Sequence, residues 1–568
     1  MKKICLNVVD LKDMLNKTKE KYGERVAYKI KLEPGKYKTI THREARDMID
    51  SLGTALIDLG LKNKRIAVIG ENRYEWEIAY LSIVCGTGTV VPLDKSLPEV
   101  ELESLIERSE IEAIFCTNKS IEMIKKIKQI KSNNLKYIIS MDYEKKDGDI
   151  YSQKELIEKG KELIEAGNAD FINAKINPDE MNIMLFTSGT TSKSKVVALS
   201  HKNLCSNLMD ASMVLEVNED DMFLSILPIH HVYECTVGFL FSLYRGAQTV
   251  FGDGIRHLVE NLNEYKPTVV ACVPGIYEII CSMLEKELGK QGNVEEIYKN
   301  EKYKNMTLKE RKKEFQNIHN LLGGNLNILL SGAAALDPVV EEKYRLLGFN
   351  LVQGYGLTEA SPIVSVVTEA AYKLGSVGRP LPNVQAKIEN ENSEGIGELV
   401  LKGPNIMLGY YGDEETTKNS LKNGWFYTGD LARIDEDGFI FICGRKKSVI
   451  VLKNGKNVFP EELETLINKI GGVKESFVYG KQKTEDKENV RIKAKIIFDR
   501  AFIKEKYNVD KDEEIQKIFN QKIKELNEKL PKYKAIRGVI ISETPLIKTT
   551  TNKIKRQENL DEIKKSEN

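Results

Sequence analysis

The chain has 568 residues, of which 41% are hydrophobic and 30% are charged. This length exceeds one ordinary core, so we expect a soluble globular protein with two or more folding units. The 85 Lys and Arg residues against 84 Asp and Glu residues leave a net charge of +1. Such a balance creates no long-range field that would collect nucleic acid or an anionic membrane, and no nucleic-acid partner is expected.

The cysteines and the N-terminal residues indicate the cellular compartment in which the protein is expected. Eight cysteines stand singly, with no C-x-x-C pair and no Cys/His ligand spacing, at positions 5, 85, 116, 205, 235, 272, 281 and 443. This usage is typical of reduced core thiols in an intracellular protein. The opening MKKICLNVVDLKDML has too short an apolar run for a signal peptide, and no window approaches 18 uninterrupted apolar residues. We therefore expect a cytoplasmic protein with no transmembrane segment.

Between about residues 41 and 380, helical stretches alternate with short β-rich runs. Helical spacing occurs in THREARDMIDSLGTALIDLGL and ELESLIERSE, and the β-rich runs are RIAVIG, AIFC, DMFLSILP, KPTVVACVP, LNILLSGAA and FNLVQGYG. Amphipathic helices followed by four to six apolar residues ended by Gly or Pro are typical of βαβ units around a buried parallel sheet. This part is predicted to be an α/β body.

The second part of the chain has a different texture. The segments NVQAKIENENSEGIGELVLKGP and WFYTGDLARIDEDGFIFICGR predict a small antiparallel β-barrel or sheet. A Lys/Glu-dense α+β segment with a long amphipathic helix near 511–530 follows, and the charged stretch 288–315 predicts solvated surface helices. The predicted fold class is α/β, with a large N-terminal domain over residues 1–446 and a small α+β C-terminal domain over residues 447–568.

A loop rich in hydroxyl groups follows one apolar run. Residues 185–204, LFTSGTTSKSKVVALSHKNL, contain seven Ser or Thr residues, one Gly and three Lys residues. Such a loop after a buried strand can direct N–H and O–H groups to one point, which makes an anion cradle of the kind that holds phosphate. The segment does not match G-x-x-x-x-G-K-[ST], and GTGTVV at 86–91 does not complete G-x-G-x-x-G. A different phosphate chemistry is indicated.

Five further motifs indicate which kind of phosphate chemistry this loop serves. They are LPIHHVYE (227–234), QGYGLTE (353–359), YTGD (427–430), GRKKSVIVLKNGKNVFPEELE (444–464) and TPLIKTTTNKIKR (544–556). In this order, over about residues 25 to 560, the chain resembles the adenylate-forming superfamily, which includes acyl-CoA synthetases, amino-acid adenylation domains and luciferases. The resemblance implies that a carboxylate attacks the α-phosphate of ATP-Mg²⁺, that pyrophosphate leaves, and that a thiol such as CoA then displaces AMP. Because an anion must approach a polyanion, catalysis should depend on positive charge and hydrogen-bond donors.

By resemblance, the hydroxyl-rich loop covers the β- and γ-phosphates. The residues that match this role are Thr187, Ser188, Gly189, Thr190, Thr191 and Lys195. The superfamily usually has glycine, proline and glycine where this chain has Ser192, Ser194 and Val196. Since two glycines with easy access to positive φ are lost, the loop geometry can differ here.

The resemblance also implies the α-phosphate, metal and adenine contacts. Thr358 corresponds to a donor to the α-phosphate, and Glu359 to a ligand of Mg²⁺, which typically takes one or two protein carboxylates. Tyr355 is expected to lie flat on adenine. The surrounding backbone wall is expected to consist of Gly332, Ala333, Ala334, Gln353, Gly354 and Gly356.

Five residues complete the site that the resemblance implies. Asp430 is expected to accept from both ribose hydroxyl groups, with Arg445 beside the ribose. His231 matches a position between the carboxylate and the thiol channel. Lys553 matches the lysine that bridges the carboxylate and the α-phosphate, although Asn552 stands where glycine is usual. Lys447 is the expected hinge of a small, mobile C-terminal domain, which must close to bring Lys553 to the site.

The sequence says less about which acid is activated and which thiol accepts the acyl group. The NGKNVFPEELE form and LPIHHVYE resemble long-chain fatty acyl-CoA synthetases, and a lipid substrate implies peripheral contact with a membrane. An acyl tunnel needs a lining such as Val237, Phe239 and Leu240, which equally suit a plain core. Amino-acid activators carry an acidic residue near the position of Glu234. Three alternatives therefore stay open: transfer to a carrier-protein thiol, adenylation of an aromatic or amino acid, and a nucleotide-binding regulatory protein without turnover.

Overall fold

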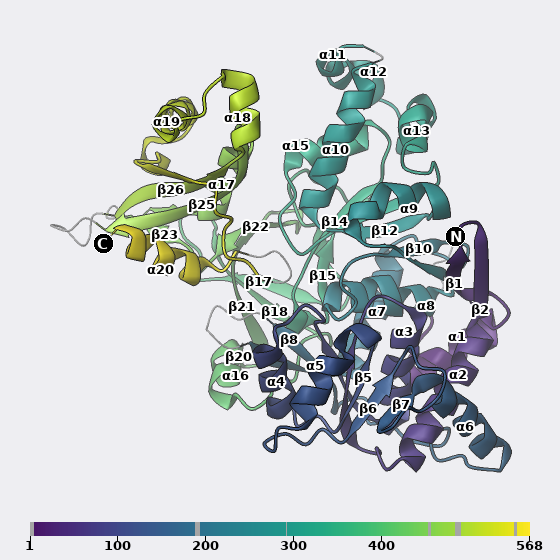
Figure 1. Ribbon diagram of the computed structural model, residues 1–568. Coiled ribbons are helices and arrows are strands. Elements are labelled where there is room, and N and C mark those ends of the chain that lie inside the picture. The colour runs from purple at the N-terminus through teal and green to yellow at the C-terminus, as the bar shows by residue number, and fades with distance from the viewer. Residues whose placement is uncertain are drawn as a thin grey trace.

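The computed structural model describes residues 5–187, 194–290, 292–452, 456–482, 490–549 and 554–567. Two large sheets form a body, and the C-terminal part stands beside it (Figure 1). Both large sheets are mostly parallel, so the predicted α/β class is confirmed.

The first large sheet has nine strands and carries the wall of the site described below. Its central strands are parallel, and β2, β15 and β16 pair antiparallel at its two edges. In spatial order the strands are β16 (Arg379–Pro380), β15 (Ile363–Val366), β14 (Leu351–Gly356), β13 (Ile328–Ser331), β12 (Val269–Cys272), β10 (Met222–Ser225), β11 (Gln248–Phe251), β1 (Val26–Glu33) and β2 (Lys36–Thr41).

The second large sheet has eight strands, and its antiparallel edge holds the hydroxyl-rich segment. In spatial order the strands are β19 (Gly409–Tyr410), β9 (Lys195–Ser200), β8 (Met181–Thr187), β4 (Gly88–Leu93), β3 (Lys64–Ile69), β5 (Ala113–Cys116), β6 (Tyr137–Ser140) and β7 (Ile150–Ser152). The strands β4 to β7 run parallel, whereas β8 and β9 form a hairpin in which Thr187 lies opposite Lys195.

Helices cover both sheets. They are α1 (Leu11–Tyr22), α2 (His42–Asp58), α3 (Tyr74–Ser82), α4 (Glu99–Arg108), α5 (Asn118–Lys128), α6 (Gln153–Glu165), α7 (His201–Val214), α8 (Phe241–Arg245), α9 (Leu258–Tyr265), α10 (Pro274–Leu288) and α15 (Pro338–Leu346). The predicted charged surface helices are α11 (Val294–Lys299), α12 (Glu301–Lys304), α13 (Leu308–Glu314) and α14 (Gln316–Asn320). Local signals set several starts: a capping box of Thr41 and Glu44 begins α2, and Pro274 occupies the first turn of α10.

The apolar run of β3 illustrates why the strands lack polar alternation. Ile66 and Val68 point into the large central core, and Ala67 and Ile69 point into a second core under α4 and α5. All four side chains are fully buried. A parallel strand with both faces covered reads as a continuous hydrophobic run, which is the pattern that the sequence shows.

A smaller antiparallel sheet follows, as the turn-rich segments predicted. It contains β17 (Gln385–Glu389), β18 (Gly397–Lys402), β21 (Trp425–Ile434), β20 (Leu421–Lys422) and β22 (Ile440–Arg445), with α16 (Glu414–Ser420) beside it. In the register of β21 and β22, Asp430 lies directly opposite Arg445. This sheet therefore brings two predicted site residues together through the backbone alone.

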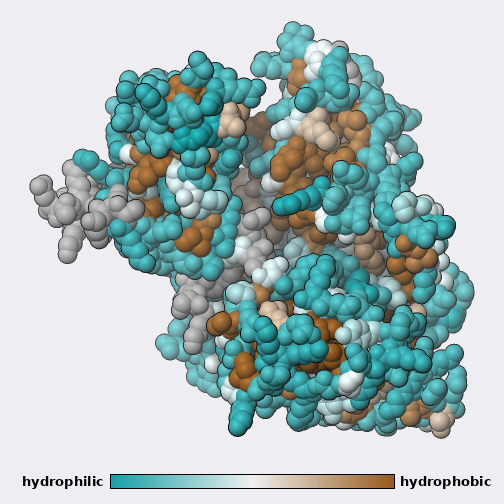
Figure 2. Space-filling view, viewed as in Figure 1, coloured by the Kyte–Doolittle hydropathy of each residue, from teal (hydrophilic) through white to brown (hydrophobic). Residues whose placement is uncertain are grey.

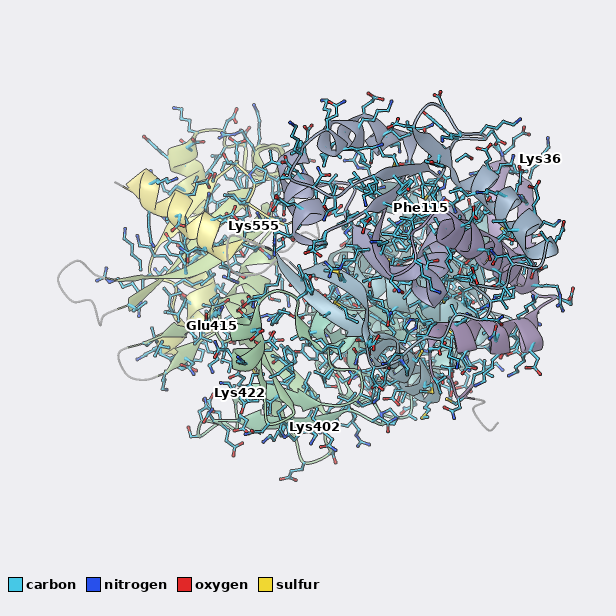
Figure 3. The ribbon with its side chains drawn as sticks, turned by 90° about the horizontal axis from the view of Figure 1, so that it is seen from below. Lys36, Phe115, Lys402, Glu415, Lys422 and Lys555 are labelled. Carbon is cyan, nitrogen blue, oxygen red and sulfur yellow. The ribbon has the colours of Figure 1, made fainter. Side chains whose placement is uncertain are left out.

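The C-terminal part has its own sheets and core. Its strands are β23 (Ile450–Val451), β24 (Asn457–Val458), β25 (Val473–Gln482), β26 (Val490–Phe498) and β27 (Val539–Ser542), and its helices are α17 (Pro460–Asn468), α18 (Arg500–Tyr507), α19 (Asp512–Glu528) and α20 (Arg556–Glu567). The fully buried residues of its main core all lie between Ile450 and Ile536. Seen from below, Lys555 lies on the side of this part that faces the large body (Figure 3).

Two surface features complete the description. Hydrophobic side chains lie on the helices beside the hollow that separates them from the C-terminal part (Figure 2), and Ile279 on α10 and Val339 on α15 are among the exposed apolar residues. Within the described ranges, no helix combines the length and the apolar character that crossing a bilayer requires.

Candidate active site

Three predicted nucleotide residues from distant segments meet at one carboxylate. The hydroxyl group of Tyr355, on β14, donates a hydrogen bond to Oδ2 of Asp430 at 2.5 Å. The Arg445 guanidinium lies with Nε 2.8 Å from Oδ1 of the same residue. Asp430 is only 4% exposed, and its backbone N–H donates to the Thr428 hydroxyl group at 3.0 Å. The carboxylate is thus held in one orientation by Tyr355 and Arg445.

A second group, at the edge of the eight-stranded sheet, contains charged side chains of both signs. Lys195 places its ammonium group 4.4 Å from the ring centroid of Tyr410, whose hydroxyl group donates to Oε1 of Glu359 at 2.9 Å. Burial lowers the pKa of Lys195, Glu359 opposes that shift, and the positive charge of Lys447 adds to it. Predicted phosphate, metal and hinge residues therefore act on one another electrostatically, with Tyr410 between two of them.

Several predicted residues fall outside the described ranges. They are Ser188, Gly189, Thr190, Thr191 and Lys553, together with the two variant positions Ser192 and Asn552. The structure does show how the chain is paired next to these residues. Thr187 and Lys195 lie opposite each other in the β8–β9 hairpin, and Lys548 and Ile554 form an antiparallel bridge.

A cavity of about 80 Å³ lies between the strand ends of the nine-stranded sheet and the segment that follows β10. Seven predicted residues line it: His231, Gly332, Ala333, Gly354, Tyr355, Gly356 and Thr358. Gln353 and Ala334 are not part of the lining. Most of the remaining wall is aliphatic, formed by Leu215, Val232, Val237, Leu330, Val352, Leu357, Pro362, Ile363 and Val366.

The orientation of Glu234 separates two classes of substrate. This residue begins the π-helix η2 (Glu234–Leu240) and is 1% exposed. Its Oε1 accepts a hydrogen bond from the Ser225 hydroxyl group at 2.6 Å, so the side chain points toward the end of β10 and does not line the cavity. Burial raises its pKa to about 8. The acidic side chain that could have received a substrate amine is therefore directed elsewhere.

Sequence reasoning missed Tyr410 and Tyr233. Tyr410 lies in the segment IMLGYYGD, where no local pattern marks it, and only the pairing of β19 with β9 brings it to Lys195. Tyr233 lines the cavity and donates its hydroxyl hydrogen to the Leu330 carbonyl at 3.1 Å. Its place inside LPIHHVYE was a usable signal, because a motif that carries one site residue can carry others.

Comparisons with known proteins agree with the geometry. Residues 15–411 match the family model described as AMP-binding enzyme, and residues 447–566 match the AMP-binding enzyme C-terminal domain. The chain belongs to this family of AMP-binding enzymes. The resemblance to adenylate-forming enzymes is thereby confirmed.

Among curated relatives, long-chain acyl-CoA synthetases are prominent. Long chain acyl-CoA synthetase 2 of Arabidopsis thaliana is 30% identical over 500 residues, covering 81% of this chain and 74% of the relative. Fatty acyl-CoA synthetase B of Dictyostelium discoideum is 28% identical over 514 residues, covering 83% and 75%. Long-chain-fatty-acid–CoA ligase 5 of Mus musculus is 29% identical over 495 residues, covering 81% and 71%.

Solved structures share the fold. ATP-bound MatB from Rhodopseudomonas palustris superposes with a TM-score of 0.76 at 23% identity, covering 98% of this chain and 99% of that chain. The anthranilate CoA ligase AuaEII in complex with anthranoyl-AMP gives 0.77 at 20% identity, with 100% of each chain covered. These similarities establish the architecture.

Proposed function

We propose that the protein uses ATP to convert a fatty acid of medium or long chain into an acyl-adenylate, and then transfers the acyl group to the thiol of CoA. In the first step a carboxylate oxygen forms a bond to the α-phosphorus and the bond to pyrophosphate breaks. In the second step the thiol sulfur bonds to the acyl carbon, AMP leaves, and the thiol proton passes to solvent. The curated relatives named above support this reaction.

The nucleotide roles follow from the two charged groups. Asp430 accepts from the ribose hydroxyl groups, Arg445 supports it, and Tyr355 lies against adenine. Lys195, with the hydroxyl-rich segment that begins at Thr187, neutralises the phosphates. Thr358 donates to the α-phosphate from the wall of the cavity. These contacts act mainly on the negative charge that builds up as pyrophosphate leaves.

Mg²⁺ fits the donor chemistry of this region. Glu359 offers a carboxylate that Tyr410 orients through Oε1, and phosphate oxygens and water can supply the remaining ligands. A bound ion supplies Lewis-acid neutralisation of phosphate oxygens. Glu359 and Tyr410 contribute by holding the carboxylate in a single orientation.

The apolar wall of the cavity is the observation that carries the choice of acid. A hydrocarbon chain gains free energy against aliphatic side chains, and among the described residues no carboxylate lines the cavity to pair with the amine of an amino acid. Ligand sites usually enclose about 300 Å³ or more, so a long chain requires lining side chains to move. Tyr233, whose hydroxyl group donates to the Leu330 carbonyl, is a bulky lining side chain whose movement would enlarge the space.

We further propose that residues 447–568 act as a lid that turns about Lys447. Lys553 then reaches the carboxylate and the α-phosphate in the closed state and leaves the site before thiol attack. His231 lines the cavity, next to the place where adenylation and thiol transfer would both occur. Access of a fatty acid from a membrane surface and a cytoplasmic location belong to the same proposal.

The test is pyrophosphate release with ATP and Mg²⁺ across acids of two to eighteen carbons, with and without CoA. We expect release to rise with chain length and acyl-CoA to form only when CoA is added. Preference for an aromatic or amino acid, or transfer to a carrier protein but not to CoA, would redirect the proposal. ATP binding without any AMP formation would identify a regulatory protein and overturn it.

A further inference from the structure

The segment between β10 and η2 forms a loop whose two ends are joined by side chains. Ser225, the last residue of β10, donates its hydroxyl hydrogen to Oε1 of Glu234, the first residue of η2, at 2.6 Å. Both residues are 1% exposed. The intervening residues 226–233 are therefore closed at the base by a buried hydrogen bond, which is stronger in this environment than at the surface.

Asn72 enters this loop from the other sheet. It lies between β3 and α3, on the eight-stranded side of the body. Its side-chain amide donates to the Ser225 hydroxyl oxygen at 2.9 Å and to the Leu227 carbonyl at 2.6 Å, and its Oδ1 accepts from the Ile229 backbone N–H at 3.3 Å. One side chain thus satisfies three groups of the loop and extends the Ser225–Glu234 bond into a continuous network.

His231 lies at the end of this loop and lines the cavity. Its backbone N–H donates to the Pro228 carbonyl at 3.0 Å, and its Nδ1 accepts from the Tyr233 backbone N–H at 3.2 Å. A neutral imidazole with Nδ1 as acceptor carries its proton on Nε2. The backbone of the loop therefore determines both the position and the tautomer of the ring.

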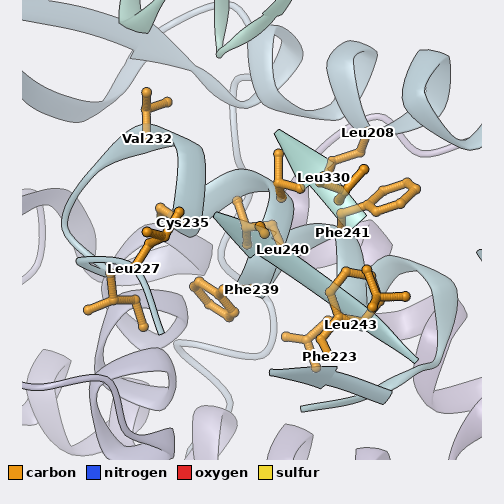
Figure 4. Packing of buried hydrophobic residues seen from close by; sticks show 14 of the residues in the cluster. Leu208, Phe223, Leu227, Val232, Cys235, Phe239, Leu240, Phe241, Leu243 and Leu330 are labelled. Atoms are coloured by element: carbon orange, nitrogen blue, oxygen red, sulfur yellow. The ribbon is translucent and has the colours of Figure 1, made fainter. Parts of the chain in front are cut away.

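The fold around the loop leaves Asn72 and Ser225 as its internal supports. In Figure 4, Val232 lies on the opposite side of the bend from Leu227 and Cys235. All three side chains belong to the central core, and Val232 also lines the cavity. Gly238 allows this arrangement, because a Cβ there would lie 2.5 Å from Oε1 of Glu234. Apolar side chains pack around the loop, and the hydrogen bonds of Asn72, Ser225 and Glu234 hold its backbone in place.

We propose that Asn72, Ser225 and Glu234 are positioning residues that hold His231 in the wall of the cavity and align it with the acid during adenylation and transfer. This inference rests on the proposed function, since it assigns the network to that same reaction. The network also joins the two large sheets at the site.

The experiment compares Ser225→Ala with Ser242→Ala. Ser242 is also fully buried, and its hydroxyl group bonds to the Thr249 hydroxyl at 2.9 Å, outside the loop. Ser225→Ala loses two buried side-chain hydrogen bonds, to Glu234 and from Asn72, whereas Ser242→Ala loses the one to Thr249. Both variants should therefore have a lower melting temperature, with the larger drop in Ser225→Ala. Misplacement of a reacting group by about 1 Å can cost roughly 100-fold, so kcat of Ser225→Ala should fall by about 10- to 100-fold. KM for ATP should stay within about twofold, because the network bonds to the loop at Ser225, Leu227, Ile229 and Glu234 and not to Asp430, Arg445 or Lys195.

A second pair of variants separates position from stability. Glu234→Gln keeps the oxygen that accepts from Ser225, and its amide group replaces the protonated oxygen, so kcat near the wild-type value is expected. Glu234→Leu removes the acceptor and should reproduce the loss of Ser225→Ala. Asn72→Ala should show the same division between kcat and KM. If Asn72→Ala does not fold, the Ser225 and Glu234 variants carry the test.

The outcomes distinguish this inference from the proposed function. Absence of acyl-adenylate formation by the wild-type protein refutes the function itself. An active wild type in which Ser225→Ala and Ser242→Ala lose the same kcat, or in which Glu234→Gln is as impaired as Glu234→Leu, refutes the positioning role alone.

Discussion

At the scale of single residues, Asp430 on β21 connects β14 and β22 in the proposed nucleotide site. It accepts from Tyr355 and pairs with Arg445, and it is nearly buried. Hydrogen bonds to charged groups contribute about 1.5–3 kcal/mol each, so Asp430→Asn should raise KM for ATP by about 10- to 100-fold.

The matched control for that substitution is Asp435→Asn. Asp435 follows the same strand and pairs with Lys373 at 2.5 Å, away from Tyr355. Initial rates at varied ATP should show a normal KM for this control. An unchanged KM in Asp430→Asn would remove Asp430 from the ribose site.

Glu234 gives a residue-scale prediction for stability against pH. Burial raises its pKa from 4.5 to about 8, and the groups that face it, Glu77, Tyr233, Cys235 and Cys272, are kept neutral by burial as well. Above pH 4.5 the unfolded chain loses this proton and the folded chain keeps it. The stabilisation is therefore complete below pH 4.5 and is lost as the pH rises toward 8.

Glu234→Gln should remove that dependence. Between pH 5 and 8 the free energy of unfolding of the wild type should decline, relative to the variant, by on the order of a few kcal/mol, and the difference should level off above pH 8. Urea unfolding at a series of pH values measures this. Parallel curves for the two proteins would mean that Glu234 titrates normally.

At the scale of elements, η2 depends on a glycine. A Cβ at Gly238 would lie 2.5 Å from Oε1 and 2.6 Å from Cδ of Glu234, and both residues are buried. Gly238→Ala should destabilise the protein by about 1–3 kcal/mol through overpacking. Adding Glu234→Ala should relieve part of this cost, which a double-mutant cycle of unfolding free energies detects.

Gly275→Ala is the control for this prediction. Gly275 lies in the first turn of α10 with no atom near the added Cβ, so the substitution should be neutral or stabilising by about 0.5–1 kcal/mol. Equal effects of the two substitutions would show that the contact between Gly238 and Glu234 has no energetic consequence.

Apolar runs and helical periodicity in the sequence predicted several elements correctly. The run RIAVIG became β3 with both faces buried, and the amphipathic stretch near 511–530 became α19. Local patterns did not predict the π-helix η2, whose first residue, Glu234, accepts a hydrogen bond from Ser225 on β10. Nor could they assign strands to two separate sheets, since that depends on packing between distant segments.

The site was predictable only where a motif identified it. Asp430, Tyr355 and Arg445 were named from YTGD, QGYGLTE and GRKKS, and the structure brings them into contact. Tyr410 and Asn72 lie in segments without a recognisable motif, so only the fold reveals their contacts. The direction of Glu234 could not be read from sequence either, because a one-position rotation on a helix turns a side chain from cavity to core.

At the scale of the whole molecule, an ion pair joins the C-terminal part to the body. Lys469, after α17, lies 2.7 Å from Asp337 at the start of α15. A partly exposed pair contributes about 0–1 kcal/mol, which would shift the proposed equilibrium between lid orientations by up to about fivefold. Lys469→Gln should therefore reduce the population of this orientation, measured by small-angle scattering at low salt.

Lys474→Gln is the matched control for the lid. Lys474 pairs with Asp499 at 3.5 Å within the C-terminal part, so its loss should leave the scattering profile unchanged. Raising the salt concentration should bring the wild type toward Lys469→Gln, since screening weakens the pair. Identical profiles of wild type and Lys469→Gln at low salt would contradict a role of this contact in lid orientation.

The central claim is that a carboxylate oxygen of the acid attacks the α-phosphorus of ATP. A fatty acid labelled with ¹⁸O in its carboxyl group tests this directly when the products of one turnover with CoA are weighed by mass spectrometry. We expect AMP that carries one ¹⁸O atom and pyrophosphate that carries none. Unlabelled AMP, or label in pyrophosphate, would contradict it.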